Sequence, residues 1–165
     1  EQDVIGIAKR KTAYLFSGCA RIGGLLGKIS DQQERALGEY GLSVGLAFQV
    51  TDDILDFSSS EGALGKPVGS DLKEGKITLP VILLFQKSNK IERQMLNKFF
   101  SQDLRNQDDF NKTLGLIKKH KIIETCKKRA DYFSNVAADS LSIFEKNFTI
   151  KKLQELSFYI VDRLN

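Results

Sequence analysis

Helical periodicity runs through almost the whole chain and is the feature that most limits its possible folds. Apolar side chains recur at steps of three and four residues from Ile5 to Leu26 and again from about residue 30 to residue 57, which is the spacing of one face of an α-helix. No segment alternates apolar and polar residues as a half-buried strand does. The sequence therefore predicts an all-α protein, and its 165 residues suit a single domain, residues 1–165.

Local signals place the ends of the predicted helices. The first helix should end near Gly27, and Ser30-Asp31-Gln32-Gln33 has the form of a capping box that begins the second. Residues 58–76 are rich in Gly, Ser and charged residues, which predicts a long loop. Further helix starts are indicated at Thr78, at Asn89-x-x-Glu92, at Asp108-Asp109 and at Thr149, giving expected helices to Phe85 and near 90–100, 108–120, 122–146 and 150–164.

Three glycines stand on one stripe of the second predicted helix. Gly38, Gly41 and Gly45 follow one another at steps of three and four. Each glycine in a helix costs up to about 1 kcal/mol relative to alanine. We therefore expect another helix backbone to approach this stripe closely.

Composition limits the class of protein but not its function. The chain is 41% apolar and 28% charged, which argues against disorder, and its net charge of +4 suits an anionic ligand without requiring one. Its two cysteines, at no metal-ligand spacing, indicate a reducing cytoplasm. The longest apolar run, Leu79 to Phe85, is too short to span a bilayer, so we expect at most peripheral membrane contact. We also expect no nucleic-acid partner. Because no Met stands at Glu1, we also expect a missing upstream portion.

Three carboxylates end the second predicted helix. Asp52 and Asp56 are one turn apart, about 40° from each other around the axis, and Asp53 flanks them. Oxygen ligands left open to water are what Mg²⁺ takes when it bridges a protein to phosphates. A solvated helix end is the simpler alternative. The near absence of charge from Gly41 to Thr51 instead indicates a buried helix that emerges at a charged mouth.

A lysine-bearing, glycine-rich segment follows these carboxylates. It places Lys66 and Lys76 among Gly65, Gly69 and Gly75. Glycines let the backbone approach an oxyanion, and lysines supply point charges for phosphate. An ordinary flexible loop with solubilising lysines is the alternative for this segment alone, whereas the two segments together predict a metal–diphosphate site.

The amino-acid sequence of these segments closely resembles the second aspartate-rich region of the trans-isoprenyl (polyprenyl) diphosphate synthases. The resemblance is carried by FQVTDDILD at 48–56 and by LGKPVGSDLKEGKITLP at 64–80, and Lys11-Thr12-Ala13 is similar to the family's diphosphate-binding Lys-Thr element. It is strong over roughly residues 5–85 and weaker beyond. It implies an orthogonal helical bundle that is the C-terminal portion of the isoprenoid synthase fold.

The resemblance also implies roles for the matching residues. Asp52 and Asp56 would hold a Mg²⁺ against the allylic diphosphate, and Asp53 would assist through water. The other implied roles are contact with the leaving diphosphate by Lys11 and Lys66, closure of the mouth of the site by Lys76, and oxygen dipoles directed at the allylic cation by Thr12 and Gln49.

By this resemblance the full-length protein, an expected homodimer, adds isopentenyl diphosphate to an allylic diphosphate. The segment from Gly65 to Pro80 is most similar to long-chain octaprenyl and heptaprenyl synthases, which make quinone side-chain precursors. The alternatives are a fragment of a geranylgeranyl or farnesyl diphosphate synthase and a non-catalytic diphosphate-binding subunit of a heteromeric synthase. Only the second of the family's two aspartate-rich regions is present, so we expect this segment alone to be inactive.

Several other residues receive a structural interpretation. His120, in a basic helix end, is interpreted as a solvated or capping residue and not as a catalytic base. The ending Tyr159-Ile160-Val161-Asp162-Arg163 resembles the Arg-bearing tail of long-chain members of the family. Six aromatic residues of the last two helices are interpreted as core: Tyr132, Phe133, Phe144, Phe148, Phe158 and Tyr159.

Overall fold

A computed structural model describes residues 1–58, 68–102 and 105–164 of the chain. Helices and turns make up these ranges, which contain no strand, so the predicted all-α class is confirmed. The chain groups into two compact units. We call Gln2–Asp52 with Lys127–Asn165 the terminal unit, and Asp53–Cys126 with Glu1 the middle unit. Each is described by itself, and the expectation of a single domain stays a prediction.

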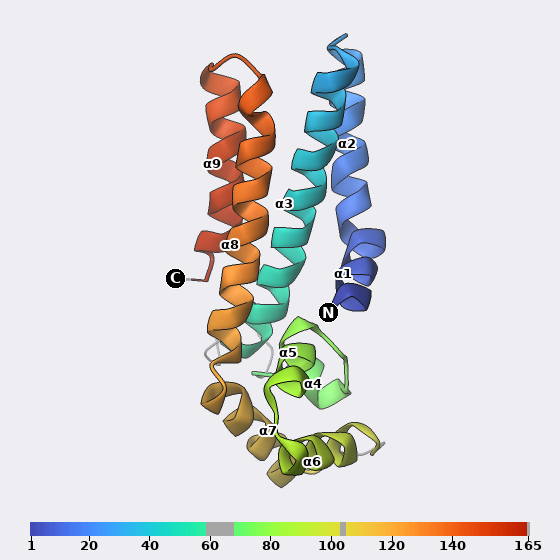
Figure 1. The fold of residues 1–165 in the computed structure, drawn as a ribbon, viewed down its shortest axis with the longest axis vertical. Helices are drawn as coiled ribbons and strands as arrows, with labels where there is room; N and C mark the ends of the chain where they lie inside the picture. The colour runs from blue at the N-terminus through green and yellow to red at the C-terminus, as the bar shows by residue number, and fades with distance from the viewer. Residues whose placement is uncertain (59–67, 103–104, 165) are drawn as a thin grey trace. The chain divides into compact units, whose positions relative to one another are not determined.

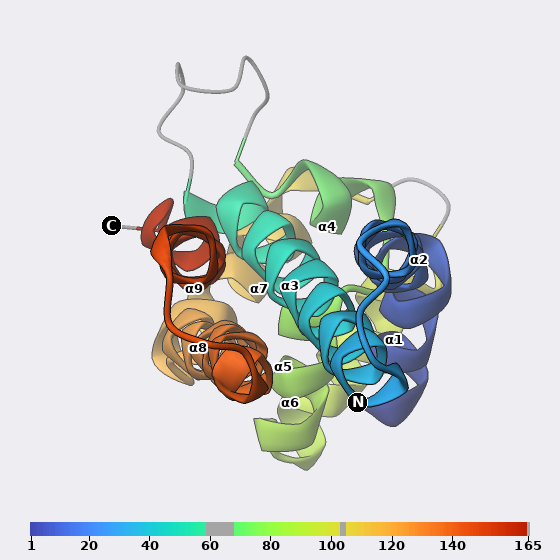
Figure 2. The same cartoon turned by 90° about the horizontal axis from the view of Figure 1, so that it is seen from above.

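The terminal unit is built around the long helix α3 (Asp31–Ser58), which belongs to it up to Asp52. Viewed from the side and from above, α3 lies between an N-terminal pair of helices and a C-terminal pair (Figures 1 and 2). The other elements of this unit are α1 (Gln2–Ala8), a π-helical turn (Lys9–Ala13), α2 (Tyr14–Leu26), α8 (Ile122–Ser140), which belongs to it from Lys127 on, a 3₁₀ turn (Leu141–Ile143) and α9 (Phe148–Asp162).

The glycine stripe of α3 lies where another helix approaches, as the sequence predicts. A Cβ added at Gly45 would lie 2.6 Å from Ala13 Cα, and one at Gly41 would lie 2.5 Å from the backbone oxygen of Phe16. At Gly38 the nearest atom belongs to the flexible Arg21 side chain, at 3.1 Å. Gly41 and Gly45 therefore permit a close contact between two helix backbones, and this contact offsets their low helix propensity.

In its described residues, the middle unit contains four helices of its own. They are α4 (Ser70–Glu74), α5 (Leu79–Lys87), α6 (Lys90–Phe100) and α7 (Gln107–Lys119). The short helix α4 lies inside the segment predicted as loop, between Gly69 and Gly75, which both have positive φ. Fully buried Leu84, Leu96 and Phe99 lie in the core of this unit.

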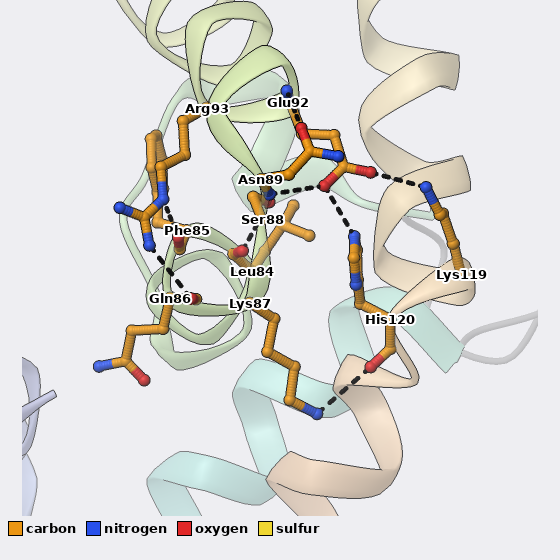
Figure 3. A network of polar contacts seen from close by, with 10 residues as sticks. All are labelled: Leu84, Phe85, Gln86, Lys87, Ser88, Asn89, Glu92, Arg93, Lys119 and His120. Atoms are coloured by element: carbon orange, nitrogen blue, oxygen red, sulfur yellow. Dashed lines mark hydrogen bonds and ion pairs between the residues drawn. The ribbon is translucent and has the colours of Figure 1, made fainter.

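A polar network joins the start of α6 to the end of α7 in the middle unit (Figure 3). Asn89 and Glu92 form the predicted capping box, with Asn89 Oδ1 accepting from the Glu92 amide at 3.0 Å and Glu92 Oε2 accepting from the Asn89 amide at 2.9 Å. Glu92 Oε1 also accepts from Lys119 Nζ at 2.8 Å, and its Oε2 lies 3.0 Å from His120 Nε2. His120 is the C-cap of α7, so the capping interpretation is confirmed, but its ring is only 19% exposed and the solvated one is wrong.

Other predicted helix ends are partly corrected. The Ser30 capping box is present, since Ser30 Oγ accepts from the Gln33 amide at 3.3 Å. Thr78 is at the N-cap position of α5 but makes no capping bond. Helices α7 and α9 begin one residue after Asn106 and Asn147, whose side chains cap them.

The described structure differs from the sequence-based expectation at the C-terminal helices. Helix α8 ends at Ser140 instead of near residue 146, and a 3₁₀ turn follows it. The core interpretation is wrong for four of the six aromatic residues, which are exposed because the described residues leave their helix faces largely uncovered: Tyr132, Phe148, Phe158 and Tyr159. Among the described helices, none combines the length and the apolar character needed to cross a bilayer.

Candidate functional site

The three predicted metal ligands lie at the end of α3 and have different surroundings. Asp52 is the last residue of α3 that belongs to the terminal unit, while Asp53 and Asp56 belong to the middle unit. The Asp52 side chain is 38% exposed. Asp53, by contrast, is only 8% exposed. The residues that lead into this end, from Gly41 to Thr51, are buried or half-buried, as expected for a helix that passes through a core.

A π-helical turn presents the predicted Lys-Thr element in the terminal unit. Lys11 and Thr12 fall within the turn Lys9–Ala13, which interrupts the helix between α1 and α2. Single π turns inside helices are rare and often stand at functional sites. Thr12 Oγ1 donates a hydrogen bond to Gln49 Oε1 of α3 at 3.0 Å, so two of the predicted site residues are in direct contact.

Two cations flank Asp52 within the terminal unit. Arg163, the C-cap of α9, places Nη2 3.5 Å from Asp52 Oδ1. The guanidinium of Arg163 also lies over the ring of Phe48, 5.5 Å from its centroid. Burial raises the pKa of Asp52, and the charges of Arg163 and Lys11 oppose that increase. Asp52 is therefore a partly desolvated carboxylate whose negative charge is stabilised by Arg163 and Lys11. A bound metal cation would stabilise the same charge in the same way.

Asp56 and Asp53 make bonds to the backbone of the middle unit. Asp56 Oδ1 accepts from Ser70 Oγ at 2.8 Å, and Asp56 Oδ2 accepts from the Asp71 amide at 3.1 Å, at the first turn of α4. Asp53 Oδ2 accepts from the Leu79 amide at 3.3 Å, at the start of α5. Asp53 thus satisfies the first amide of α5, while Thr78 makes no capping bond.

The predicted phosphate-binding lysines are only partly described. Lys76 pairs with Asp71 and with Glu74, each at 2.8 Å, and these bonds raise the pKa of its ammonium group above the ordinary value. Gly75, just before it, has a φ of 80°, which favours glycine. Lys66 lies outside the described residues.

The described carboxylates offer oxygen ligands but no complete metal site by themselves. No group of three or more His, Cys, Asp or Glu side chains within residues 1–58, 68–102 and 105–164 is arranged to hold a metal ion. Mg²⁺ binds through one or two carboxylates and completes its six oxygen ligands with water and substrate phosphates. Asp52 and Asp56 stand four residues apart in α3, and their role as metal ligands stays a prediction.

Sequence reasoning named Arg163 without giving it a role in the site. A single arginine at the end of a predicted helix could have been placed next to Asp52 only if the arrangement of α3 and α9 were known. Ser70 and Asp71, which are the hydrogen-bond partners of Asp56, were also missed, because the short helix that carries them was expected to be a loop.

Comparisons with known proteins identify the family of the chain. The sequence profile described as Polyprenyl synthetase matches residues 1–117. The chain is 34% identical over 165 residues to a geranylgeranyl diphosphate synthase of Saccharolobus solfataricus, covering 99% of this chain and 49% of that protein. It is 31% identical over 163 residues to an octaprenyl diphosphate synthase of Haemophilus influenzae, again covering 99% and 49%.

A solved structure extends the comparison to the fold. A polyprenyl synthase of Caulobacter crescentus CB15, complexed with calcium and isoprenyl diphosphate, superposes with a TM-score of 0.89 at 30% identity, over 98% of this chain and 49% of that one. The chain thus spans about half the length of the relatives it matches. On the matched profile and these relatives, the chain belongs to the polyprenyl synthetase family.

Proposed function

We propose that this chain is the C-terminal part of a trans-polyprenyl diphosphate synthase that adds isopentenyl diphosphate to an allylic diphosphate. The proposed product is a long-chain all-trans polyprenyl diphosphate, a quinone side-chain precursor. Relatives named as octaprenyl and as geranylgeranyl diphosphate synthases both cover 99% of the chain, so the long-chain product is supported by the wording of the segment from Gly65 to Pro80 and not by relatedness. The proposed full-length protein is a homodimer.

One observation carries the proposal. Within the terminal unit, the Lys-Thr element and α3 meet through the bond from Thr12 to Gln49, and Lys11 acts electrostatically on Asp52. Residues from two segments that share no local signal therefore converge on one polar cluster. Such a cluster of cation, carboxylate and oriented oxygens supports binding of a metal–diphosphate.

The carboxylates have a proposed division of roles. Asp52 and Asp56 hold a Mg²⁺ against the diphosphate, and Asp53 assists through water. When bound, the metal neutralises negative charge on the departing diphosphate. The donor set is suitable, because it offers hard oxygen ligands and leaves positions open for phosphate and water.

The remaining residues act on the two products of bond cleavage. The carbon–oxygen bond of the allylic diphosphate breaks, and the electron pair leaves with the pyrophosphate. Lys11 and Lys66 contact that anion, and Lys76 closes the mouth of the site. Thr12 Oγ1 donates a hydrogen bond to Gln49 Oε1, which directs the lone pairs of Thr12 Oγ1 toward the electron-poor allylic carbon, and Gln49 contributes its oxygen dipole.

Binding of inorganic pyrophosphate to the 165-residue chain tests the proposal. We expect weak, Mg²⁺-dependent binding by isothermal titration calorimetry and no chain elongation by the chain alone. Asp52→Asn should lower the affinity for Mg²⁺–pyrophosphate at least tenfold, about 1.4 kcal/mol, because a metal ligand is lost. Asp131→Asn removes an equal charge from an exposed position of α8 in the same unit and should leave the affinity unchanged. Equal affinities for wild type and Asp52→Asn would contradict the proposed site, and elongation by the isolated chain would contradict its incompleteness.

A further inference from the structure

Arg163 is positioned more firmly than its place near the end of the chain suggests. Its guanidinium lies over Phe48, and Phe48 in turn lies 5.9 Å, ring to ring, from Phe16 of α2. The residue after it is also fixed, since Lys127 Nζ of α8 donates to the Leu164 carbonyl at 2.8 Å. These contacts give the arginine an aromatic support although its side chain is partly exposed.

This support directs Arg163 to one carboxylate. Arg163 Nη2 lies 3.5 Å from Asp52 Oδ1, and each of the two side chains is a little over a third exposed. An ion pair of that exposure is worth only about 0–1 kcal/mol, so it adds little to folding stability. The pair does, however, place a positive charge beside the carboxylate that is proposed to receive a metal ion.

A guanidinium and a divalent cation cannot use the same carboxylate oxygen from the same side. Arg163 presents only donors, so it has no atom that could serve as a metal ligand. Its charge also repels an approaching Mg²⁺. Lys11 adds a second positive charge near Asp52, which makes the carboxylate better compensated in the absence of metal.

We infer that Arg163 is a positioning residue that holds Asp52 in an ion pair when no metal is bound and is displaced when a divalent cation binds. This inference rests on the proposed function, since it takes Asp52 to be a metal ligand. The inference has one measurable consequence: Arg163 lowers the affinity of the chain for a metal ion that binds without diphosphate. The site then favours the metal–diphosphate, whose phosphate oxygens can accept the displaced guanidinium.

Binding of Mn²⁺ alone, measured by the electron paramagnetic resonance signal of the free ion with Mg²⁺ as competitor, tests the inference. Arg163→Gln should bind Mn²⁺ about three- to tenfold more tightly than wild type, because both the pair and the repulsion are removed. Arg163→Lys keeps the charge and loses the planar fork, so its affinity should fall between the two. Lys151→Gln is the matched control: it removes the same charge from α9, about 18 Å away along the helix by its rise of 1.5 Å per residue, and should change nothing.

Asp52→Asn separates the two hypotheses. If Asp52→Asn abolishes Mn²⁺ binding and Arg163→Gln strengthens it only when Asp52 is present, the inference is supported. If Asp52→Asn abolishes binding but Arg163→Gln leaves it unchanged or weakens it, the role of Arg163 is refuted and the proposed metal site stands. If Asp52→Asn binds Mn²⁺ like wild type, the proposed site itself fails, and the inference fails with it. Far-UV circular dichroism of each variant verifies that the helices are intact. If Arg163→Gln is unfolded, Phe48→Leu replaces it, because this change removes the aromatic support of Arg163 but no charge. Phe48→Leu should strengthen Mn²⁺ binding by less than tenfold, and an unchanged affinity would refute the inference.

Discussion

The contact between α3 and the N-terminal helices should be destroyed by one added methyl group. In Gly45→Ala the new Cβ would lie 2.6 Å from Ala13 Cα and 3.0 Å from Ala13 Cβ. Carbon atoms in contact prefer about 3.5–4.0 Å, so the two backbones must separate by roughly 1 Å. No side-chain rotation can relieve a clash between backbone atoms.

The expected loss follows from two opposing effects. Alanine gains up to about 1 kcal/mol over glycine in a helix. Overpacking of a tight contact costs about 1–3 kcal/mol, and backbone partners place this site at or beyond the upper end. We therefore expect Gly45→Ala to lower the free energy of unfolding by about 2 kcal/mol, which corresponds to about 4–8 °C in the melting temperature for a chain of this size.

Thermal and urea unfolding followed by circular dichroism measure this effect. Gly18→Ala and Gly23→Ala are matched controls in α2, because a Cβ at either position meets no atom within 4 Å. Each control should gain up to about 1 kcal/mol. If Gly45→Ala were as stable as the controls, the helices would not approach as closely as described, and the explanation of the glycine stripe would be wrong.

Three further predictions concern individual polar contacts. The pKa of the Glu92 carboxylate is lowered from 4.5 to about 2, first by the bond from Lys119, so its stabilising effect is present above pH 4.5 and lost as the pH falls toward 2. Glu92→Gln should therefore flatten the dependence of the urea unfolding midpoint on pH between these values. An unchanged slope would contradict the network. Tyr40→Phe removes the 2.8 Å bond from Oη to the Leu153 carbonyl and should cost about 1–2 kcal/mol in urea unfolding, whereas no loss would mean that water replaces the bond. Asp53→Ala should cost about 1 kcal/mol more in urea unfolding than Asp53→Asn, whose amide oxygen can still accept at the start of α5, and equal losses would exclude the capping role.

The sequence predicts what local chemistry determines. The capping boxes at Ser30 and Asn89 bring together residues three apart, and both are present in the structure. The periodicity of α3 and the need for a close neighbour at Gly41 and Gly45 are also properties of one helix, so they could be inferred without knowing which helix approaches. For the same reason the position of the three carboxylates at the end of α3 follows from the sequence alone.

Contacts between distant segments could not be predicted in this way. The π turn at Lys9–Ala13 contains no proline or glycine that would signal it, and the ion pair between Asp52 and Arg163 joins residues 111 positions apart in sequence. The contact of His120 with Glu92 could not be inferred either, because the two residues lie 28 positions apart in sequence. Each of these features depends on how helices are arranged, and periodicity carries no information about that.

The end of α3 shows why a motif is not equivalent to a site. Its three carboxylates look interchangeable in sequence, yet Asp53 is buried against the start of α5, Asp56 binds the first turn of α4, and Asp52 is flanked by cations. A carboxylate that accepts from a backbone amide has fewer lone pairs left for a metal ion, and loss of its bond destabilises the fold. Substitutions of Asp53 should therefore affect folding before binding, whereas substitutions of Asp52 should affect binding with little effect on folding. The ratio of the two effects at each position distinguishes structural from metal-binding carboxylates more directly than loss of activity does.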